Sequence, residues 1–468
     1  MAATFTASAT GAQELERIGG HEDALDIDAE GVLTIEGCSA TDLIQDYGSP
    51  LYVISESTLR RNFRRIRDAF RARWPTEFTV YYALKSNNNF AVRAILFEEG
   101  AGGDCFGEGE LYATFVGGAD PNHVVMNGSN KTQAELRKAV ELGICVNIDA
   151  EDEIDLIDEI VAASGRRARV ALRLAVIPEE YDTTGSVAAY PWGFPEEAAI
   201  PLVQRLQADQ SVDFEGYSMH IGRVSPHPAF FHRWASMLGE TVVSLERATG
   251  FRPQRLDVGG GFPRRRDIEA GHDPAGEPRE YLNPHDIVDY ADAVTAPLLS
   301  AFEDASLPMP QLAVEPGRYI VGSAGTLLTS VGAVKRHSQR VWVNLDVSVN
   351  NLMMRETRDY EYWLLPASRM TDAFSESCFV AGPICMGKPL GRGTPLPRMV
   401  RDDVLAVLDA GMYAETLSTQ MNGVPRPATV LVNDGRHELI KERETVRDVF
   451  ARYILPERFR AEPGLGQR

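Results

Sequence analysis

The chain has 468 residues, and its content of 44% hydrophobic and 24% charged residues is that of a globular protein, which excludes a disordered, fibrous or membrane-spanning chain. Its 67 acidic residues exceed its 47 basic residues, and the resulting formal net charge of −20 disfavours nucleic acid and anionic lipid as partners. Because the N-terminus also lacks the basic and then apolar pattern of a secretory signal, we expect a cytoplasmic protein.

Four regions are predicted along the chain, which is long enough for two domains. Residues 1–30 have weak periodicity and are expected to form a partly ordered extension. Residues 31–54 contain strand-like runs that we expect to join the sheet of the second domain. Residues 55–320 alternate short apolar runs with helical spacing, which predicts a (β/α)8 barrel of the α/β class. Residues 321–468 return to strand-like runs between Gly, Pro and Asn turns, which predicts a mostly β second domain.

Eight short apolar or β-branched runs are the predicted barrel strands. Stretches between them, such as Thr132–Leu142, place apolar residues three and four apart, as expected of helices that cover a barrel. In chain order the predicted strands are Phe78–Leu84, Ala101–Cys105, His123–Asn127, Cys145–Asp149, Arg169–Ala175, Phe214–Ile221, Arg255–Val258 and Gln311–Val314.

Two local patterns are expected to carry no chemistry. The five cysteines are odd in number and lack C-x-x-C spacing, which predicts reduced thiols and neither a disulfide framework nor a metal site. The run Arg264-Arg265-Arg266 is short and basic, and we expect it to be a solvated surface loop.

Lys85 lies at the end of the first predicted strand, in Tyr-Tyr-Ala-Leu-Lys-Ser. In barrels of this kind function gathers at the carboxyl ends of the strands. An isolated lysine there is most often an extended surface side chain. A partly desolvated lysine, however, loses its proton more readily and becomes an amine that can form an imine. The choice therefore depends on the neighbouring motifs.

The seventh and eighth units supply residues suited to an anion. Gly259, Gly260 and Gly261 follow the seventh strand, and glycine amides can approach an anion without hindrance from a Cβ atom. Glu315-Pro316-Gly317-Arg318 follows the eighth strand and places a carboxylate and a guanidinium at one junction. Phosphate groups bind at the loops after these two strands in many barrels, so we expect a phosphate-bearing ligand.

Six motifs in order resemble those of the diaminopimelate and ornithine decarboxylase family, and with their flanking pattern they span Gly31 to Pro456. The resemblance implies a fold type III enzyme with an alanine-racemase-like barrel and a β domain. It also implies pyridoxal 5'-phosphate as cofactor, an amino acid as substrate, and a head-to-tail homodimer with shared active sites. The motifs are the Lys85 segment, His220-Ile221-Gly222, Gly259–Gly261, Glu315-Pro316-Gly317-Arg318, Gly382-Pro383-Ile384-Cys385 and Asp409-Ala410-Gly411-Met412-Tyr413.

The resemblance also implies a role for each matching residue. Lys85 would hold the cofactor as a Schiff base, His220 would stack on its ring, and Glu315 would face the pyridine nitrogen. A carboxylate there keeps the nitrogen protonated and makes the ring a strong electron sink. Cys385 would come from the partner subunit to protonate the product, although a small buried core residue is the alternative. The other implied cofactor residues are Asp104, Arg173, Arg223, Gly259, Gly260, Gly261, Gly317, Arg318 and Tyr413.

The chain departs from the family pattern at two places that bear on the substrate. Arg223 stands where the family has a serine, and could pair with phosphate or with an anionic substrate. The run Met386-Gly387-Lys388 after Cys385 lacks the acid that reads a distal ammonium, and an Arg-Pro-x-x-Tyr stretch is not cleanly present near Met354–Thr357. We therefore expect decarboxylation of an amino acid or amino-acid conjugate, such as one of siderophore assembly, rather than a free diamino acid. The expected substrate contacts are Arg223, Arg318, Met386 and Lys388.

Three alternatives remain open at this point. The first is diaminopimelate decarboxylase proper. The second is a racemase on the same fold, against which Glu315 argues because such racemases place an arginine at the pyridine nitrogen. The third is a silent homologue that binds partners, against which the retention of Lys85, His220, Glu315 and Cys385 argues.

Overall fold

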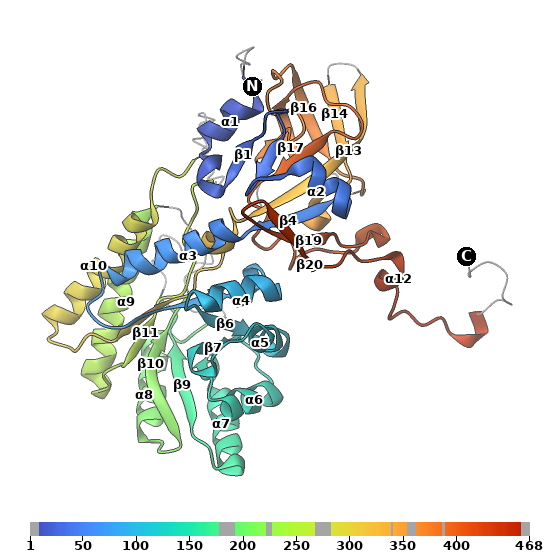
Figure 1. The fold of residues 1–468 in the computed structure, drawn as a ribbon. Coiled ribbons are helices and arrows are strands. Elements are labelled where there is room, and N and C mark those ends of the chain that lie inside the picture. The colour runs from blue at the N-terminus through green and yellow to red at the C-terminus, as the bar shows by residue number, and fades with distance from the viewer. Residues whose placement is uncertain are drawn as a thin grey trace.

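The computed structural model describes residues 9–176, 192–220, 227–266, 282–337, 340–352, 362–385 and 389–459. These residues form a barrel with its helices and, beside it, a second body made mostly of strands (Figure 1). Within these ranges, no helix has the length and apolar character needed to span a bilayer. The predicted site residues Arg223, Met386 and Lys388 lie outside the described residues.

Eight parallel strands close into a barrel in the order β10-β11-β12-β5-β6-β7-β8-β9, which confirms the predicted (β/α)8 architecture. Their side chains are buried on almost every position, as expected when the barrel core lies on one face and helices cover the other. The strands are β5 (Phe78–Ala83), β6 (Gly102–Phe106), β7 (Val124–Asn127), β8 (Cys145–Ile148), β9 (Ala168–Arg173), β10 (Val212–Ser218), β11 (Arg255–Asp257) and β12 (Gln311–Val314).

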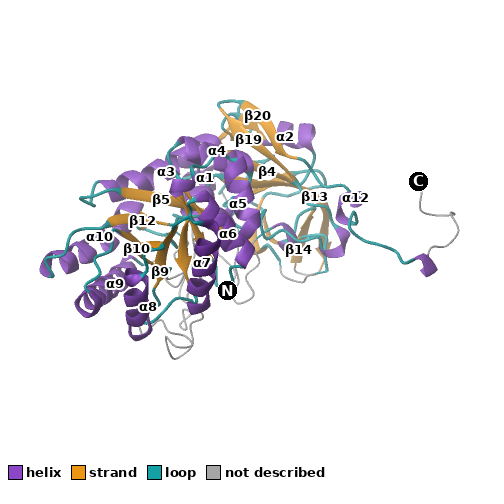
Figure 2. Ribbon diagram, turned by 90° about the horizontal axis from the view of Figure 1, so that it is seen from below, coloured by secondary structure: helices purple, strands orange, loops and turns teal. Residues whose placement is uncertain are grey.

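The helices between these strands pack around the barrel, as Figure 2 shows. A typical one is α6, which begins at a capping box in which the Thr132 hydroxyl accepts from the backbone amide of Glu135, and which ends at Gly143 with φ +74°. The barrel helices are α3 (Glu56–Arg71), α4 (Phe90–Glu98), α5 (Gly107–Val116), α6 (Gln133–Leu142), α7 (Glu151–Ser164), α8 (Glu196–Ala208), α9 (Pro228–Thr249), α10 (Ile287–Asp304) and α11 (Arg318–Val321).

The second body is a nine-stranded sheet in which β4, from the N-terminal part of the chain, lies between β13 and β19. It pairs antiparallel with β13 and parallel with β19, and then leads directly into the barrel through α3. The barrel is thus inserted between β4 and the other strands of this sheet. The strands are β4 (Leu51–Ser55), β13 (Gly325–His337), β14 (Arg340–Leu345), β15 (Leu364–Leu365), β16 (Glu376–Ala381), β17 (Gly391–Leu396), β18 (Val404–Val407), β19 (Ala428–Asn433) and β20 (Arg436–Lys441).

Residues 9–47 add two helices and a small sheet to the second body. The helix α1 (Gly11–Arg17) begins at a Thr10 capping box, and Leu15 is fully buried in a core shared with strands of the second body. The strands β1 (Leu25–Ile27), β2 (Leu33–Ile35) and β3 (Cys38–Ser39) form a three-stranded sheet, and α2 (Ala40–Tyr47) follows. Within the N-terminal segment predicted to be partly ordered, regular structure begins with α1 at Gly11, and apolar residues of the segment contribute to this core.

The described chain ends in a segment that extends away from both bodies (Figures 1 and 2). It contains the short helix α12 (Val446–Val449) and continues to Phe459. Its apolar side chains are strongly exposed, including Val446 at 61%, Tyr453 at 77% and Ile454 at 85%. An apolar surface of this kind on a globular protein marks an interaction site.

The expectation that Arg264-Arg265-Arg266 is a solvated loop is wrong for two of its three residues. Arg264 and Arg266 are each only 4% exposed. Both are ion-paired with Asp409, which lies far away in the sequence. Only Arg265 resembles the expected surface residue, with a side chain that is 47% exposed and paired with Glu22.

Candidate active site

Lys85 lies in a 3-10 turn, Leu84–Ser86, directly after β5 at the mouth of the barrel. A loop of the second body holds this turn by three hydrogen bonds. The Thr416 hydroxyl donates to the Lys85 carbonyl at 2.9 Å, and the Tyr413 amide donates to the Ser86 carbonyl at 2.6 Å. The Asn87 side chain donates to the Gly411 carbonyl at 3.2 Å. The backbone of Lys85 is thus fixed by both bodies of the molecule.

The Lys85 ammonium lies among acidic and aromatic groups. Its Nζ atom is 3.9 Å from Asp104 Oδ2 and 4.9 Å from the centre of the Phe106 ring. Burial alone would lower the pKa of Lys85, but electrostatic interaction with the acidic groups of Asp104, Tyr413 and Glu315 outweighs it and raises this pKa above its usual value. The expectation that desolvation favours the neutral amine is therefore wrong for the chain without a ligand.

Asn127 connects the two acids that face Lys85, and sequence reasoning missed it. Its side-chain amide donates to Asp104 Oδ1 at 2.8 Å and to Glu315 Oε1 at 2.7 Å. Asn147 in turn donates to Asn127 Oδ1 at 2.9 Å, which fixes the orientation of the amide. Asn127 is the last residue of β7, so its place at the carboxyl end of a predicted strand was a usable signal.

The described residues do not fully satisfy the buried acids at the barrel mouth. Burial, with Asp104 and Asp257 nearby, raises the pKa of Glu315 well above its usual value, and burial raises the pKa of Asp257 to about 6. One oxygen of Asp104 and one of Asp257 accept no hydrogen bond from the described part of the chain. Unsatisfied buried carboxylate oxygens are costly, so this mouth is suited to a cationic group of a ligand.

His220 is held as a neutral ring. Its Nδ1 atom accepts a hydrogen bond from the Gly260 amide at 3.2 Å, so the ring proton must lie on Nε2. Burial, together with the charges of Lys85 and Arg173, lowers the pKa of His220 well below its usual value. The 3.9 Å approach of Nδ1 to Glu315 is therefore a contact with a neutral ring and not an ion pair.

Gly259 and Gly260 are required by close packing. A Cβ atom on Gly259 would lie 2.5 Å from the Met219 carbonyl oxygen, and one on Gly260 would lie 2.1 Å from that of Glu315. The Gly259 amide donates to Asp257 Oδ1 at 2.9 Å, and the Gly260 amide donates to His220. These two amides therefore fix the loop against its neighbours, while Gly261 continues it with φ +99°.

Gly317, Arg318 and Tyr413 lie together beside this loop. Arg318 is 7% exposed, and its guanidinium carbon is 5.9 Å from the centre of the Tyr413 ring. A Cβ atom on Gly317 would lie 2.8 Å from the Ser86 hydroxyl, so glycine lets the β12 end pack against the Lys85 turn. The eighth strand, the Lys85 turn and the second body thus bring a guanidinium and a phenol together, a pair suited to an anion.

Arg173 and Cys385, the remaining described candidates, differ in their surroundings. Arg173 is buried at the end of β9, with Nε 3.8 Å from Asp149 Oδ1, and Asp149 is a partner that sequence reasoning did not identify. Cys385 is exposed on the second body, and its thiol is 3.6 Å from Asn422 Oδ1. Asn422, the partner of this thiol in the described chain, lies in the short turn Met421–Gly423 of the second body.

Glu110 on α5 gives the site a pH-dependent stability. Its Oε2 atom accepts from the Phe106 amide at 2.7 Å, and burial raises its pKa from 4.5 to about 7. At this residue the folded chain then binds more protons than the unfolded chain between these two values, so the contribution of Glu110 to the free energy of unfolding is highest below pH 4.5 and falls as the pH rises to about 7. We expect the free energy of unfolding of Glu110→Gln to fall by about 1–3 kcal/mol less than that of the wild type over this pH range.

Chemical unfolding of the cofactor-free protein at about pH 5 and about pH 8 measures this effect. Glu108→Gln is the matched control, since Glu108 is an exposed carboxylate on the same helix. An unchanged difference between the two pH values in Glu110→Gln would contradict the assignment.

The chain matches the family model described as "Pyridoxal-dependent decarboxylase, pyridoxal binding domain" over residues 56–322. It is 34% identical over 437 residues to the diaminopimelate decarboxylase of Methanothermobacter thermautotrophicus, covering 93% of this chain and 98% of that protein. It is 30% identical over 438 residues to that of Archaeoglobus fulgidus, covering 92% and 98%. Its structure resembles that of diaminopimelate decarboxylase from M. jannaschii in complex with L-lysine, with a TM-score of 0.85, 28% identity, and coverage of 93% and 99%.

These relatives overturn the expectation that the substrate is a conjugate and not a free diamino acid. Diaminopimelate, after which they are named, is itself a free diamino acid. The earlier expectation depended on Met386–Lys388 and on the stretch near Met354, two short segments that both lie outside the described residues. Similarity that extends over nine tenths of the chain outweighs them.

Proposed function

Because the chain belongs to the pyridoxal-dependent decarboxylases, which are carboxy-lyases that use pyridoxal 5'-phosphate, we propose that it removes a carboxylate of diaminopimelate as carbon dioxide. The whole-chain similarity to enzymes named for this substrate carries the proposal. We also propose that the enzyme works in the cytoplasm, where its five cysteines, which are odd in number and lack C-x-x-C spacing, would stay reduced.

The residues at the barrel mouth fit the charges of this cofactor. We propose that Lys85 holds it covalently and that Glu315, with Asp104 beside it, faces its ring nitrogen. The cationic ring nitrogen would supply a positive charge beside the unsatisfied oxygen of Asp104. Arg318 and Tyr413, with the loop of Gly259–Gly261, would hold the phosphate. When bound, the cofactor accepts the electron pair left on the substrate carbon as carbon dioxide departs.

The chain's own residues would hold this arrangement in place. Asn127 donates to both Asp104 and Glu315, so neither carboxylate can turn away without losing a buried hydrogen bond. The hydrogen bond from Gly260 fixes the neutral ring of His220 for stacking against the cofactor. The positions of Arg173, Gly317 and Arg223 relative to the cofactor stay predictions, as do those of the substrate contacts Met386 and Lys388.

A substrate panel tests the proposal directly. Purified protein loaded with pyridoxal phosphate is incubated with diaminopimelate, lysine, ornithine and an N-acylated diamino acid, and carbon dioxide and the amine products are measured. We expect diaminopimelate to be consumed with equal amounts of carbon dioxide and lysine appearing. Preference for ornithine, lysine or the acylated compound would refute the proposed substrate, and inversion without release of carbon dioxide would refute the reaction.

We further propose that the working form is a head-to-tail homodimer in which Cys385 of one subunit donates a proton at the active site of the other. Cys385 is exposed, as a residue that reaches a neighbouring subunit must be. The exposed apolar residues of the segment 446–459 give a second copy of the chain a surface to cover. Burial of such side chains is the main favourable contribution to association.

Replacing Ile454 with glutamate is expected to shift this dimer toward monomer and to reduce decarboxylation in parallel. A carboxylate at a position that is 85% exposed costs the single subunit little, but it would be costly to bury in an interface. Sedimentation velocity and the rate of carbon dioxide release measure the two effects. Arg452→Ala, a change in the same exposed segment, is the control. A variant that stays dimeric and active would contradict the role of this segment.

A further inference from the structure

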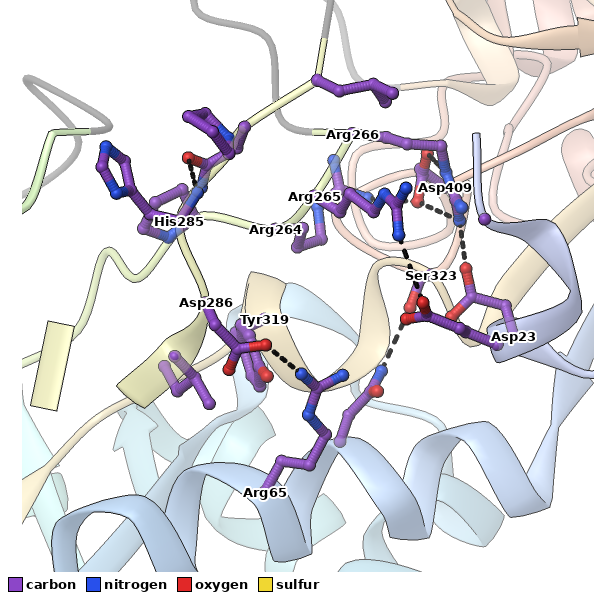
Figure 3. A pocket seen from close by; sticks show the side chains of 18 of the residues that line it. Asp23, Arg65, Arg264, Arg265, Arg266, His285, Asp286, Tyr319, Ser323 and Asp409 are labelled. Carbon is purple, nitrogen blue, oxygen red and sulfur yellow. Dashed lines mark hydrogen bonds and ion pairs between the residues drawn. The ribbon is translucent and has the colours of Figure 1, made fainter. Parts of the chain in front are cut away.

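Five buried or half-buried charged residues form one ionic network behind the glycine loop, and we call it the Arg266 cluster (Figure 3). Arg266 donates to both oxygens of Asp409, from Nε at 2.8 Å and from Nη2 at 3.1 Å. It also donates to Asp23, whose other oxygen is 2.8 Å from Arg61 Nη2. Arg264 Nη1 is 2.9 Å from Asp409 Oδ1. The cluster lines a cavity of about 500 Å³.

The central members of the cluster are shielded from water. Arg266 is 4% exposed, and Asp23 and Asp409 are each 6% exposed. Burial opposes the ionisation of Asp23, yet the charges of Arg266 and Arg61 lower its pKa below the usual value. A buried network of this kind is stable only when it is complete, because removing one member leaves an uncompensated charge.

The cluster joins three segments that are far apart in the sequence. Arg264 and Arg266 follow the glycine loop of the seventh unit, and Asp409 follows β18 on the second body. Asp23 ends the turn Gly20–Asp23 in the N-terminal segment. A bidentate pair between a planar guanidinium and a carboxylate fixes direction as well as distance. The cluster therefore sets how the barrel loop and the loop of the second body lie relative to each other.

The loop that begins at Asp409 has a backbone conformation that surrounding contacts must stabilise. Asp409 has φ +58° and Tyr413 has φ +56°, so two non-glycine residues adopt the left-handed conformation within five positions. Strained backbone of this kind persists only where the surrounding structure fixes it. Tyr413 is also the residue whose amide bonds to the Lys85 turn. A shift at Asp409 would thus reach the cofactor site directly.

We propose that Asp23, Arg266 and Asp409 are positioning residues for the cofactor phosphate, which they align by holding the glycine loop and the Tyr413 loop together. The inference rests on the proposed placement of the phosphate between these loops, but not on the identity of the substrate. It makes cofactor affinity depend on Asp23, a residue of the N-terminal segment. None of the three needs to touch the cofactor.

The test compares cofactor binding with and without a phosphate group. Cofactor-free wild-type protein and the variant Arg266→Met are titrated with pyridoxal 5'-phosphate and with pyridoxal, and absorbance reports binding. We expect the Kd for pyridoxal phosphate to rise about 10- to 100-fold in the variant, while the Kd for pyridoxal changes less than about threefold. Arg265→Met is the matched control, because Arg265 is exposed and pairs only with exposed Glu22 in the described chain.

An equal loss of affinity for the two ligands, or an unchanged affinity for pyridoxal phosphate, would overturn the inference. A merely structural role would weaken the binding of both ligands alike, whether or not they carry a phosphate. If Arg266→Met does not fold, Asp23→Asn gives the same test with one charge of the cluster removed. We expect it to lose affinity for pyridoxal phosphate as well, but by a smaller factor. A wild-type protein that binds pyridoxal as tightly as pyridoxal phosphate would overturn the phosphate placement and this inference with it. Inactivity toward diaminopimelate would refute the substrate alone, because binding is measured without one.

Discussion

Lys85→Ala is expected to lower the rate of carbon dioxide release from diaminopimelate by about 10³-fold or more, because the variant lacks the amine that we propose to hold the cofactor. The loss should be one of chemistry and not of folding. Of the three hydrogen bonds that hold the Lys85 turn to the second body, two are accepted by the backbone carbonyls of residues 85 and 86, and the third is donated by the Asn87 side chain. Alanine keeps these carbonyls in place, and with them the shape of the turn.

Two measurements on the same samples separate the possibilities. The absorbance band of covalently held pyridoxal phosphate should vanish in Lys85→Ala, and carbon dioxide release should fall with it. Lys138→Ala is the matched control, since Lys138 is an exposed lysine on α6. A variant at position 85 that keeps the band and the activity would show that the cofactor is attached elsewhere.

Glu315→Gln is expected to reduce kcat by about 10²- to 10³-fold, which is the usual effect of removing one preorganised electrostatic partner from an active site. Glutamine has nearly the same shape, and its oxygen can still accept from Asn127, as Glu315 does at 2.7 Å. What it lacks is the negative charge that would keep the cofactor nitrogen protonated. The change therefore removes the proposed function of the residue while leaving the packing intact.

The stability of Glu315→Gln should move in the opposite direction from its activity. Burial and the neighbouring Asp104 and Asp257 raise the pKa of Glu315, so its charge is unfavourable to the fold without cofactor. We expect the cofactor-free variant to be at least as stable as the wild type. Glu153→Gln is the contrasting control, because it breaks the buried ion pair with Lys131, at 2.8 Å, and should cost about 3–5 kcal/mol.

Thermal or chemical unfolding of the cofactor-free proteins and single-turnover kinetics of the loaded ones measure this contrast. Full activity in Glu315→Gln would show that another group faces the cofactor nitrogen. A loss of stability equal to that of Glu153→Gln would show that Glu315 serves the fold instead.

The barrel could be predicted because its strands are apolar on both faces and its helices carry an apolar stripe, and both signals are local. Strand ends were less predictable. The run that begins at Phe78 stays apolar through Leu84, but the ladder stops at Ala83 because Leu84 begins the turn that presents Lys85. A composition pattern cannot distinguish a last strand residue from a first turn residue when both are buried.

Site residues that belong to a sequence motif could be predicted. Residues that act by hydrogen bonding to another site residue could not. Lys85, His220, Glu315 and Arg318 do gather at the barrel mouth, as the polar groups at the ends of successive strands suggested. Asn127 was missed because an asparagine after an apolar run is also an ordinary turn residue. The pKa of Lys85 was predicted in the wrong direction because the argument counted burial but not the carboxylate of Asp104.

The arginine run shows the limit of local charge patterns most clearly. Three consecutive arginines are typical of a solvated loop, and no nearby residue contradicts that interpretation. The acids that pair with the two buried arginines, Asp23 and Asp409, lie far away in the sequence, one on either side of the run. Substrate preference was mispredicted for a related reason, since it was inferred from two short stretches and not from the chain as a whole.

The position of β4 has a consequence for how the protein is made. Residues 51–55 leave the ribosome long before β13 and β19, the two strands that flank them in the finished sheet. Both edges of this apolar strand therefore lack hydrogen-bonding neighbours until the entire barrel has been synthesised. Chaperones that protect extended apolar segments should accordingly find a target here, and a permuted chain that starts at residue 56 and carries β4 at its end should depend on them less.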